Sequence, residues 1–251
     1  MTLDLHQFGY DQDNYGVLLH DSESGETAMV DAGDAAAARA ALATAGWQLT
    51  QIWITHHHGD HTAGLQDIAA ETSAVIHGPA GVSGVTNTLS GGDIFVFAGR
   101  RVEVLATPGH TLDMLNYHLA SESLAFTGDT LFAMGCGRLF EGDAEMMWES
   151  LTKLMALDDE TIIYCSHEYT AANAAFALSV DPDNQALQRR AEAVAELRAA
   201  GQPTVPTIMA LEKETNPFLR ADDAAIRTVL GMESATDSAV FAEIRRRKDS
   251  F

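Results

Sequence analysis

Short apolar runs alternate with amphipathic stretches along the first two thirds of the chain. Three stretches carry apolar residues at helical spacing and are opened or preceded by a small or acidic residue, which predicts helices at Asp34–Ala45, His61–Glu71 and Ala144–Leu157. Shorter runs rich in β-branched, aromatic or other apolar residues are interpreted as strands, at Tyr15–His20, Ala28–Asp31, Ile52–Thr55, Ala74–His77, Ile94–Phe97, Val102–Thr107, Leu115–Leu119, Leu124–Thr127 and Ile162–Ser166. This alternation predicts an α/β (α+β) fold.

The pattern changes to a purely helical one from about residue 170. Asn184–Ala200 is rich in Ala, Glu, Arg and Leu with apolar residues at helical spacing, and Asp222–Leu230 and Ser238–Arg247 follow the same pattern. We therefore predict two domains, a catalytic α/β domain at 1–172 and a small helical domain at 173–251.

The composition is that of a globular protein with a large excess of acidic groups. The 251 residues are 46% apolar and carry a formal net charge of −21, which argues against a nucleic-acid partner because such a protein needs a basic surface. No apolar run reaches the ~18–20 residues of a membrane-spanning helix, so no membrane partner is expected. The N-terminus shows no export signal, and Cys136 and Cys165 cannot make a disulfide framework, so we expect a cytoplasmic location.

Basic residues are concentrated at the C-terminus. Arg39 is the single basic residue among the first 99, whereas Arg245, Arg246, Arg247 and Lys248 are consecutive. Such a run is ordinarily a solvated helix face. In so acidic a chain it is also a place where a small anion can bind, and both interpretations stay open.

The densest cluster of metal-ligating residue types follows a predicted strand. The segment Ile52–His61 reads IWITHHHGDH and presents His56, His58, Asp60 and His61 within six residues. Imidazole and carboxylate groups suit zinc, manganese and iron. Residues two apart in extended backbone point the same way, so His56 and His58 can share one ion while Asp60 and His61 reach a second. A polar turn that is rich in histidine by accident is the alternative without chemistry.

Three further candidate ligands each follow a predicted strand. His110 lies in TPGHT, Asp129 in TGDT and His167 in SHEYT. Taken alone, a lone histidine is more often structural and a lone aspartate is more often a turn former. Their shared position favours the functional interpretation, because binding and catalytic sites of α/β sheets usually lie beyond the carboxyl ends of the strands.

In this order the motifs THHHGDH, TPGHT, TGDT and SHEYT resemble the metallo-β-lactamase superfamily. The segments DNY, GCGR with EG, HEYT, NPFLR and the C-terminal RRRKDSF make the chain more narrowly similar to glyoxalase II, the hydroxyacylglutathione hydrolases. The resemblance implies an αββα sandwich with a small C-terminal helical domain that contributes to glutathione binding. It also implies hydrolysis of the thioester of S-(2-hydroxyacyl)glutathione, typically S-D-lactoylglutathione, in methylglyoxal degradation.

The resemblance also implies a binuclear metal centre made of histidines and aspartates. One ion would be held by His56, His58 and His110, a second by Asp60, His61 and His167, with Asp129 bridging both. Asp60 would in addition orient the attacking water. Zinc is the expected metal, with iron or manganese as alternatives.

Glutathione recognition in the family falls on positions that match Arg138, Tyr169, Arg245 and Lys248. The family often has a tyrosine where this chain has Phe140. The missing hydroxyl removes one hydrogen bond, which is about 0.5–1.5 kcal/mol of binding. The expected partner is a small glutathione thioester, and a monomer is expected.

Other functions remain as alternatives. A persulfide dioxygenase-like iron oxidoreductase of the same superfamily uses one metal, so the intact second ligand set and the long helical tail disfavour it. A β-lactamase is disfavoured because no export signal is present, and a ribonuclease is disfavoured by the charge. A non-catalytic metal-binding scaffold is disfavoured because structural zinc sites are usually closed and rich in cysteine.

Overall fold

The computed structural model describes residues 3–251, and packing divides them into two compact units. The first unit comprises the described residues up to Ala106 together with Asp113–Gly128, and the second comprises Thr107–Leu112 together with Asp129–Phe251. The predicted division into domains at 1–172 and 173–251 stays a prediction. Within residues 3–251 there is no helix that combines the length and the apolar character needed to span a membrane.

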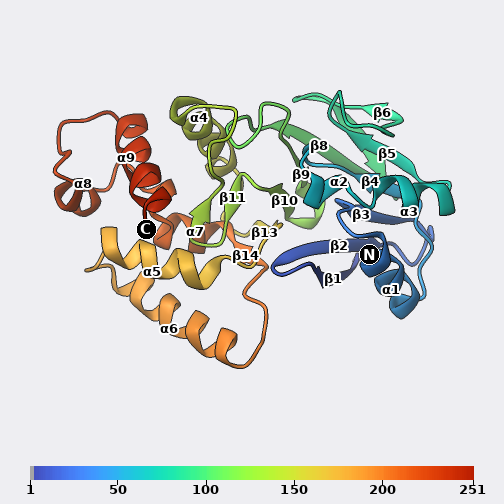
Figure 1. Ribbon diagram of the computed structural model, residues 1–251, viewed down its shortest axis with the longest axis horizontal. Helices are drawn as coiled ribbons and strands as arrows, with labels where there is room; N and C mark the ends of the chain where they lie inside the picture. Colours follow the sequence, from blue (N-terminus) through green and yellow to red (C-terminus); the bar gives the residue numbers. More distant parts are fainter. Residues whose placement is uncertain (1–2) are drawn as a thin grey trace. The chain divides into compact units, whose positions relative to one another are not determined.

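The first unit contains a mixed six-stranded sheet (Figure 1). Its first three strands are antiparallel, and each later strand is parallel to its neighbour. In spatial order the strands are β1 (Asp4–Tyr10), β2 (Asn14–His20), β3 (Thr27–Val30), β4 (Gln51–Trp53), β5 (Val75–Gly78) and β6 (Asn87–Thr88). The parallel part explains the alternation of strand and helix that the sequence shows.

A set of antiparallel strands in the same unit packs against this sheet through aromatic side chains. These strands are β7 (Ile94–Phe97), β8 (Arg100–Ala106), β9 (Leu115–Leu119) and β10 (Leu124–Gly128), with the short helix η1 (Ala120–Glu122) between the last two. Trp53 of β4 is fully buried and contacts the rings of Phe95, Phe97, Tyr117 and Phe126 at centroid distances of 5.2–6.1 Å. The facing surfaces of the mixed sheet and of the antiparallel strands are therefore buried against each other and form the core of this unit.

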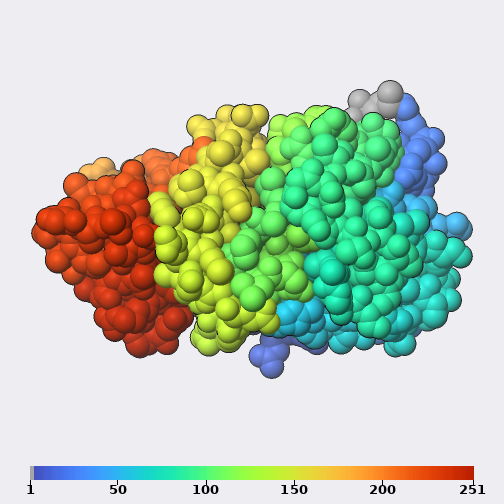
Figure 2. Space-filling model, turned by 90° about the horizontal axis from the view of Figure 1, so that it is seen from above, coloured from blue at the N-terminus to red at the C-terminus, as the bar shows by residue number. Residues whose placement is uncertain are grey.

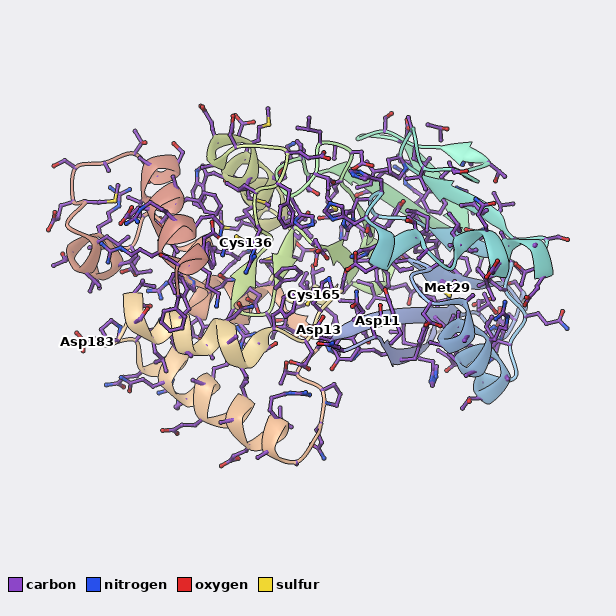
Figure 3. All side chains as sticks on the ribbon, in the orientation of Figure 1. Asp11, Asp13, Met29, Cys136, Cys165 and Asp183 are labelled. Atoms are coloured by element: carbon purple, nitrogen blue, oxygen red, sulfur yellow. The ribbon has the colours of Figure 1, made fainter. Side chains whose placement is uncertain are left out.

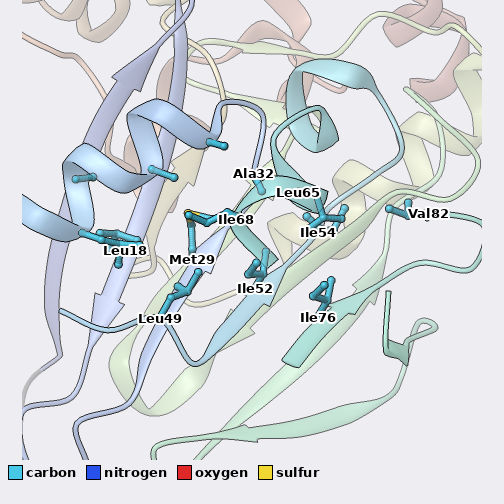
Figure 4. Packing of buried hydrophobic residues seen from close by; sticks show 14 residues of the cluster. Leu18, Met29, Ala32, Leu49, Ile52, Ile54, Leu65, Ile68, Ile76 and Val82 are labelled. Carbon is cyan, nitrogen blue, oxygen red and sulfur yellow. The ribbon is translucent and has the colours of Figure 1, made fainter. Parts of the chain in front are cut away.

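Helices cover the other face of the mixed sheet. Apolar residues of α1 (Ala35–Ala45) and α3 (Leu65–Glu71) join Met29, Ile52 and Ile76 of the strands in one buried cluster (Figure 4). The predicted helix His61–Glu71 is wrong in one respect, because it is two helices, α2 (Gly59–Thr62) and α3. The break lies at Gly64, where an added Cβ would come within 2.4 Å of the backbone nitrogen of Ala35.

The second unit is mainly helical. It contains the hairpin of β11 (Leu131–Phe132) and β12 (Gly135–Cys136) and the antiparallel pair of β13 (Ile162–Cys165) and β14 (Thr207–Ile208). Its helices are α4 (Ala144–Met155), α5 (Thr170–Val180), α6 (Gln185–Ala199), α7 (Met209–Thr215), η2 (Pro217–Leu219), α8 (Ala224–Leu230) and α9 (Asp237–Asp249). The residues of α8 and α9, red in Figure 2, form a continuous surface region of this unit.

Apart from the helix divided at Gly64, each predicted strand and helix occurs, with ends shifted by a few residues. The sequence did not predict β1, β6, β11, β12, β14, α5, α7 and the short helices η1 and η2. In β1 the residues Leu5–Gly9 are partly or wholly exposed and give no clear alternation, as expected at the edge of a sheet. In α5 the buried residues lie on one face, but the exposed positions Ala171, Ala172 and Ala175 are also apolar, so the sequence shows little contrast between the two faces.

Candidate metal centre

The metal-ligating cluster of the first unit begins where β4 ends. Ile54 donates its N–H to the carbonyl of His77, and the chain then turns at Thr55. The backbone N–H of Thr55 donates to Oδ1 of Asp31 (2.8 Å), and its hydroxyl donates to the same carboxylate. Both residues are buried. Asp31 therefore fixes the direction in which the chain leaves the strand and enters the histidine-rich loop.

His56 and His58 point toward each other after this turn. Nε2 of His56 lies 3.0 Å from Nδ1 of His58, and the other ring nitrogen of His56 lies 3.0 Å from the hydroxyl of Thr55. The intervening His57 is exposed, and its Nδ1 contacts the carboxylate of Asp113 instead. In extended backbone successive side chains point to opposite sides, so the rings of His56 and His58 lie on one side and the ring of His57 lies on the other.

Asp60 and His61 lie on the first turn after the loop, in α2. Nδ1 of the fully buried His61 lies 2.8 Å from Oδ2 of Asp31, and its Nε2 lies 3.5 Å from Oδ2 of Asp60. The Asp60 carboxylate accepts a hydrogen bond from Asn14 (3.1 Å), and its side chain is 40% exposed. The carbonyl of Asp60 approaches Gly33 so closely that a Cβ there would lie 1.9 Å away, so only glycine fits at position 33.

The candidate ligands of the second unit are centred on Asp129. Its Oδ2 lies 3.3 Å from Nε2 of His110, and its Oδ1 lies 3.3 Å from Nε2 of His167. All three side chains are buried. A single carboxylate that faces a different imidazole nitrogen with each oxygen has the donor arrangement of a bridging ligand between two cations.

The orientation of His110 is set by the loop after β12. Nδ1 of His110 lies 2.9 Å from the carbonyl oxygen of Arg138, and because a carbonyl only accepts, Nδ1 carries the proton. The loop passes close to Asp129 at Gly137, where a Cβ would lie 2.0 Å from the carbonyl oxygen of Asp129. Nε2 is therefore the nitrogen of His110 that can bind a metal.

Two aromatic rings line this part of the second unit. The ring of Tyr169 stacks on His167 at a centroid distance of 4.7 Å and an interplanar angle of 1°. The ring of Phe140 meets His110 edge-on at 5.2 Å, and Phe140 is 63% exposed. Both aromatic positions predicted for substrate binding thus contact a predicted metal ligand.

The basic run at the end of α9 divides into side chains with different roles. Arg246 and Arg247 both bind Glu243, whose pKa they lower to about 2 through hydrogen bonds. Arg245 is buried, pairs with Asp249 and donates from Nη1 to the carbonyl of Cys136 (2.9 Å). The run is therefore not a uniform patch of positive charge.

Lys248 is the half-buried cation at the end of the run. Its Nζ donates to the carbonyl of Ala172 (2.9 Å). Burial, together with the nearby positive charges of Arg245 and Arg138, lowers the pKa of Lys248 to about 8. Arg138 is exposed. Among residues 3–251, neither Lys248 nor Arg138 forms an ion pair with a carboxylate in the structure, so both can receive an anion.

Cys136 and Cys165 are free, buried thiols in the second unit (Figure 3). Burial raises the pKa of Cys136 to about 11 and that of Cys165 to about 12. Neither thiol has the character of a metal ligand or a nucleophile at neutral pH.

Sequence analysis missed the residues that support the ligands. Asp31 and Asn14 are buried and hold His61 and Asp60, respectively. The signal for Asp31 is its place at the end of a predicted strand, which it shares with Asp129. Asn14 lies in the DNY segment, which carries part of the family resemblance but no local signal of a contact with Asp60.

Family models match nearly the whole chain. The model described as "Metallo-beta-lactamase superfamily" matches residues 11–86 and 80–167, and the model described as "Hydroxyacylglutathione hydrolase C-terminus" matches residues 168–251. Among curated proteins, the hydroxyacylglutathione hydrolase of Rhizobium meliloti (strain 1021) is 54% identical over 254 residues, covering 100% of this chain and 99% of that protein. The hydroxyacylglutathione hydrolase of Maricaulis maris (strain MCS10) is 53% identical, with 98% of each chain covered.

Solved structures share the fold at lower identity. ETHE1 from Myxococcus xanthus superposes with a TM-score of 0.67 at 25% identity, covering 100% of this chain and 99% of that chain. The BLEG-1 B3 metallo-β-lactamase gives a TM-score of 0.66 at 19% identity, covering 86% of this chain and 99% of that one. The expected fold class, a metallo-β-lactamase-like fold with a C-terminal helical region, is thereby confirmed.

Proposed function

Since the chain belongs to the hydroxyacylglutathione hydrolase family of the metallo-β-lactamase superfamily, we propose that it hydrolyses the thioester of S-(2-hydroxyacyl)glutathione. The products are glutathione and a 2-hydroxy acid, and S-D-lactoylglutathione is the typical substrate. Identity above 50% along the full chain supports this function over the persulfide dioxygenase-like alternative. The match of the C-terminal family model supports a role of the last helices in this activity.

The observation that carries the proposal is the placement of Asp129 between two imidazoles. The superfamily implies two divalent metal ions, and the donor chemistry fits them, because Asp129 faces Nε2 of His110 and of His167 with different oxygens. In His56, His61 and His110 the ring nitrogen Nδ1 is held by a hydrogen bond, which leaves Nε2 for the metal. This is the usual support of metal-bound histidine. In this proposal His56, His58 and His110 would hold one ion, Asp60, His61 and His167 would hold the other, and Asp129 would be shared by both. Zinc is the proposed metal for both sites.

When bound, such a pair of ions lowers the pKa of water and polarises a carbonyl group. The remaining work belongs to the side chains. Asp60 accepts a hydrogen bond from the attacking water and orients it, and Asn14 and Tyr10 hold Asp60 in place through its carboxylate and its carbonyl oxygen. The leaving group is a thiolate with a conjugate acid of pKa about 8.5, by analogy with cysteine, so it departs without a strong general acid.

Glutathione recognition is proposed for the aromatic and basic residues of the second unit. Glutathione carries two carboxylates, and the protein is strongly acidic, so local positive charge has to bind the substrate. Arg138 and Lys248 supply cations without a carboxylate partner among the described residues, and Arg245 supplies a guanidinium beside them. Tyr169 and Phe140 flank the histidines with exposed aromatic surface.

A monomer in the cytoplasm completes the proposal. The support for the location is that Cys136 and Cys165 are free thiols, as is usual in a reducing compartment. Sedimentation of the purified protein and fractionation of cells test these two statements.

The decisive experiment combines metal analysis with substrate comparison. The purified enzyme is expected to contain two divalent ions per chain and to cleave S-D-lactoylglutathione without oxygen. A matched thioester of a small thiol that lacks the glutamyl and glycyl carboxylates should be cleaved with a much lower kcat/KM. One iron per chain and oxygen consumption with glutathione persulfide would instead support the dioxygenase alternative. Full metal loading without thioesterase activity would support the scaffold alternative.

A further inference from the structure

The turn of the β11–β12 hairpin is held by buried amide side chains of the second unit. Nδ2 of Asn216 donates to the carbonyls of Phe132 (3.2 Å) and Gly135 (3.0 Å). Nδ2 of Asn173 donates to the carbonyl of Ala133 (3.1 Å). Asn216 is fully buried and Asn173 is almost so. Backbone carbonyls that solvent satisfies in most turns are therefore bound here by side chains of the helical region.

The same turn is bound by a buried carboxylate. Met134 has a positive φ of 54°, a conformation that a residue with a side chain rarely adopts. Its backbone N–H donates to Oε2 of Glu212 (2.8 Å), and Nδ2 of Asn216 lies 3.0 Å from the same oxygen. Glu212 is fully buried. The Glu212 carboxylate thus binds both the backbone N–H of Met134 and the amide of Asn216. That amide in turn binds the carbonyls of Phe132 and Gly135.

A buried guanidinium balances the charge of Glu212. Arg190 of α6 binds Oε1 of Glu212 and the hydroxyl of Thr215, and Thr207 donates its hydroxyl to the same Oε1 (2.7 Å). A carboxylate in the interior needs such partners, because an unpaired buried charge is strongly destabilising. The buried polar network beside the hairpin thus consists of Arg190, Thr207, Glu212 and Asn216.

The hairpin connects two parts of the proposed metal site. Asp129 lies two residues before β11, and Gly137 and Arg138 follow β12 directly. The N–H of Gly137 donates to the carbonyl of Thr130 (3.2 Å), and the carbonyl of Arg138 binds Nδ1 of His110 (2.9 Å). Any shift of the hairpin therefore moves both the bridging carboxylate and the group that fixes the tautomer of His110.

We propose that Glu212 and Asn216 are positioning residues for the metal ligands Asp129 and His110. They act through the backbone of the hairpin and do not touch the ions or the substrate. The helical region then has a second role besides substrate binding, because it sets the geometry of ligands that lie outside its helices. This inference rests on the proposed function only in taking Asp129 and His110 as metal ligands.

The test compares two asparagines of the same unit. Asn216→Ala removes the bonds to the hairpin, and Asn184→Ala is the matched control, because Asn184 caps α6 and binds Asp181 and the carbonyl of Glu214. Both asparagines have several hydrogen-bond partners, and Asn184 makes no hydrogen bond to the hairpin. Zinc affinity is measured by competition with a chelator, and amide exchange of the metal-free protein is measured at Met134 and Gly137.

We expect the two variants to lose a similar amount of thermal stability but to differ in zinc affinity and in amide exchange. Asn216→Ala should lower zinc affinity by at least about tenfold, as supporting residues of metal ligands usually do, and should accelerate exchange at Met134 and Gly137. Asn184→Ala should retain the zinc affinity and exchange rates of the unaltered protein at these positions. Equal zinc affinity and equal exchange in both variants would overturn the inference.

A second variant covers the case in which Asn216→Ala does not fold. Glu212→Gln keeps the shape of the side chain and one acceptor oxygen, and it should give the same two changes in smaller measure. Unaltered zinc affinity and exchange in a folded Glu212→Gln protein would then overturn the inference. Neither measurement uses a thioester, so an unaltered protein that binds zinc but lacks thioesterase activity would overturn the proposed function alone.

Discussion

Asp31 and His61 form a fully enclosed hydrogen-bonded pair, with Oδ2 of the carboxylate 2.8 Å from Nδ1 of the imidazole. Oδ1 of the same carboxylate accepts the backbone N–H of Thr55. One side chain therefore sets both the rotation of the ring and the path of the chain that carries His56. Asp31 therefore supports the proposed metal site without being one of its proposed ligands.

Substitution of Asp31 is expected to weaken metal binding. Asp31→Asn presents an amide to His61 and removes a charge that supports the ring, so zinc affinity should fall by about 10–100-fold. Competition with a chelator measures this change. Asp113→Asn is the control, because Asp113 binds His57, which is not a proposed ligand. A loss of similar size in the control would show that the effect is not specific to the supported ligand.

Replacement of Asp129 is expected to affect both ions at once. Asp129→Asn removes one negative charge from between His110 and His167, so metal content should fall below two ions per chain and kcat should drop by about a hundredfold or more. Asp143→Asn serves as the control, because Asp143 only caps α4 through the N–H of Met146. Retention of two ions with unaltered kcat in Asp129→Asn would contradict the bridging role.

Substrate affinity is expected to depend on pH through Lys248. Its pKa of about 8 means that the side chain is charged below pH 8 and neutral above it. Since the proposed substrate is an anion, KM for S-D-lactoylglutathione should rise as the pH increases through about 8. Lys248→Arg keeps its charge at higher pH and should flatten this rise. The same pH profile in both proteins would exclude Lys248 as the titrating group.

The consecutive arginines are expected to differ in their effects. Arg245→Ala removes a buried guanidinium and its bond to the carbonyl of Cys136, and we expect KM for the glutathione thioester to increase by about tenfold or more while kcat changes less. Arg246→Ala should alter KM by less than about twofold, because exposed ion pairs such as that with Glu243 contribute little. Steady-state kinetics of both variants distinguish a specific role from the general charge of the run.

Restoring a hydroxyl at position 140 is expected to strengthen substrate binding. Phe140 is exposed and contacts His110 through its ring, so a tyrosine fits without displacing neighbours. One added hydrogen bond of about 0.5–1.5 kcal/mol corresponds to a KM about 2–13-fold lower for S-D-lactoylglutathione in Phe140→Tyr. The thioester of a small thiol is the control substrate, and its KM should not change. An equal change for both substrates would place the effect outside glutathione recognition.

The sequence was most informative where several levels of structure agree. The strand before His56 and the helical pattern from His61 onward both occur in the structure, although the helical segment starts at Gly59 and is divided at Gly64. Asp129 was harder to interpret, since an aspartate after a strand is usually a turn former. Its contacts with His110 and His167 distinguish it from that ordinary role.

Other features had no local signal in the sequence. The partners of Glu212 are up to 78 residues away in the sequence, and a glutamate in a short helix ordinarily lies at the surface. The role of Arg245 was likewise hidden, because a run of four basic residues does not reveal which side chain turns inward. Such long-range polar contacts depend on the folded arrangement of α6, α7 and α9 and could not be derived from periodicity.

The burial of Cys136 and Cys165 has a consequence for an enzyme that releases a thiol at every turnover. With pKa values of about 11 and 12, both side chains remain protonated near neutral pH, and the protonated form does not attack a disulfide. Because both thiols are buried and protonated, we expect oxidised glutathione to form mixed disulfides with this protein only slowly.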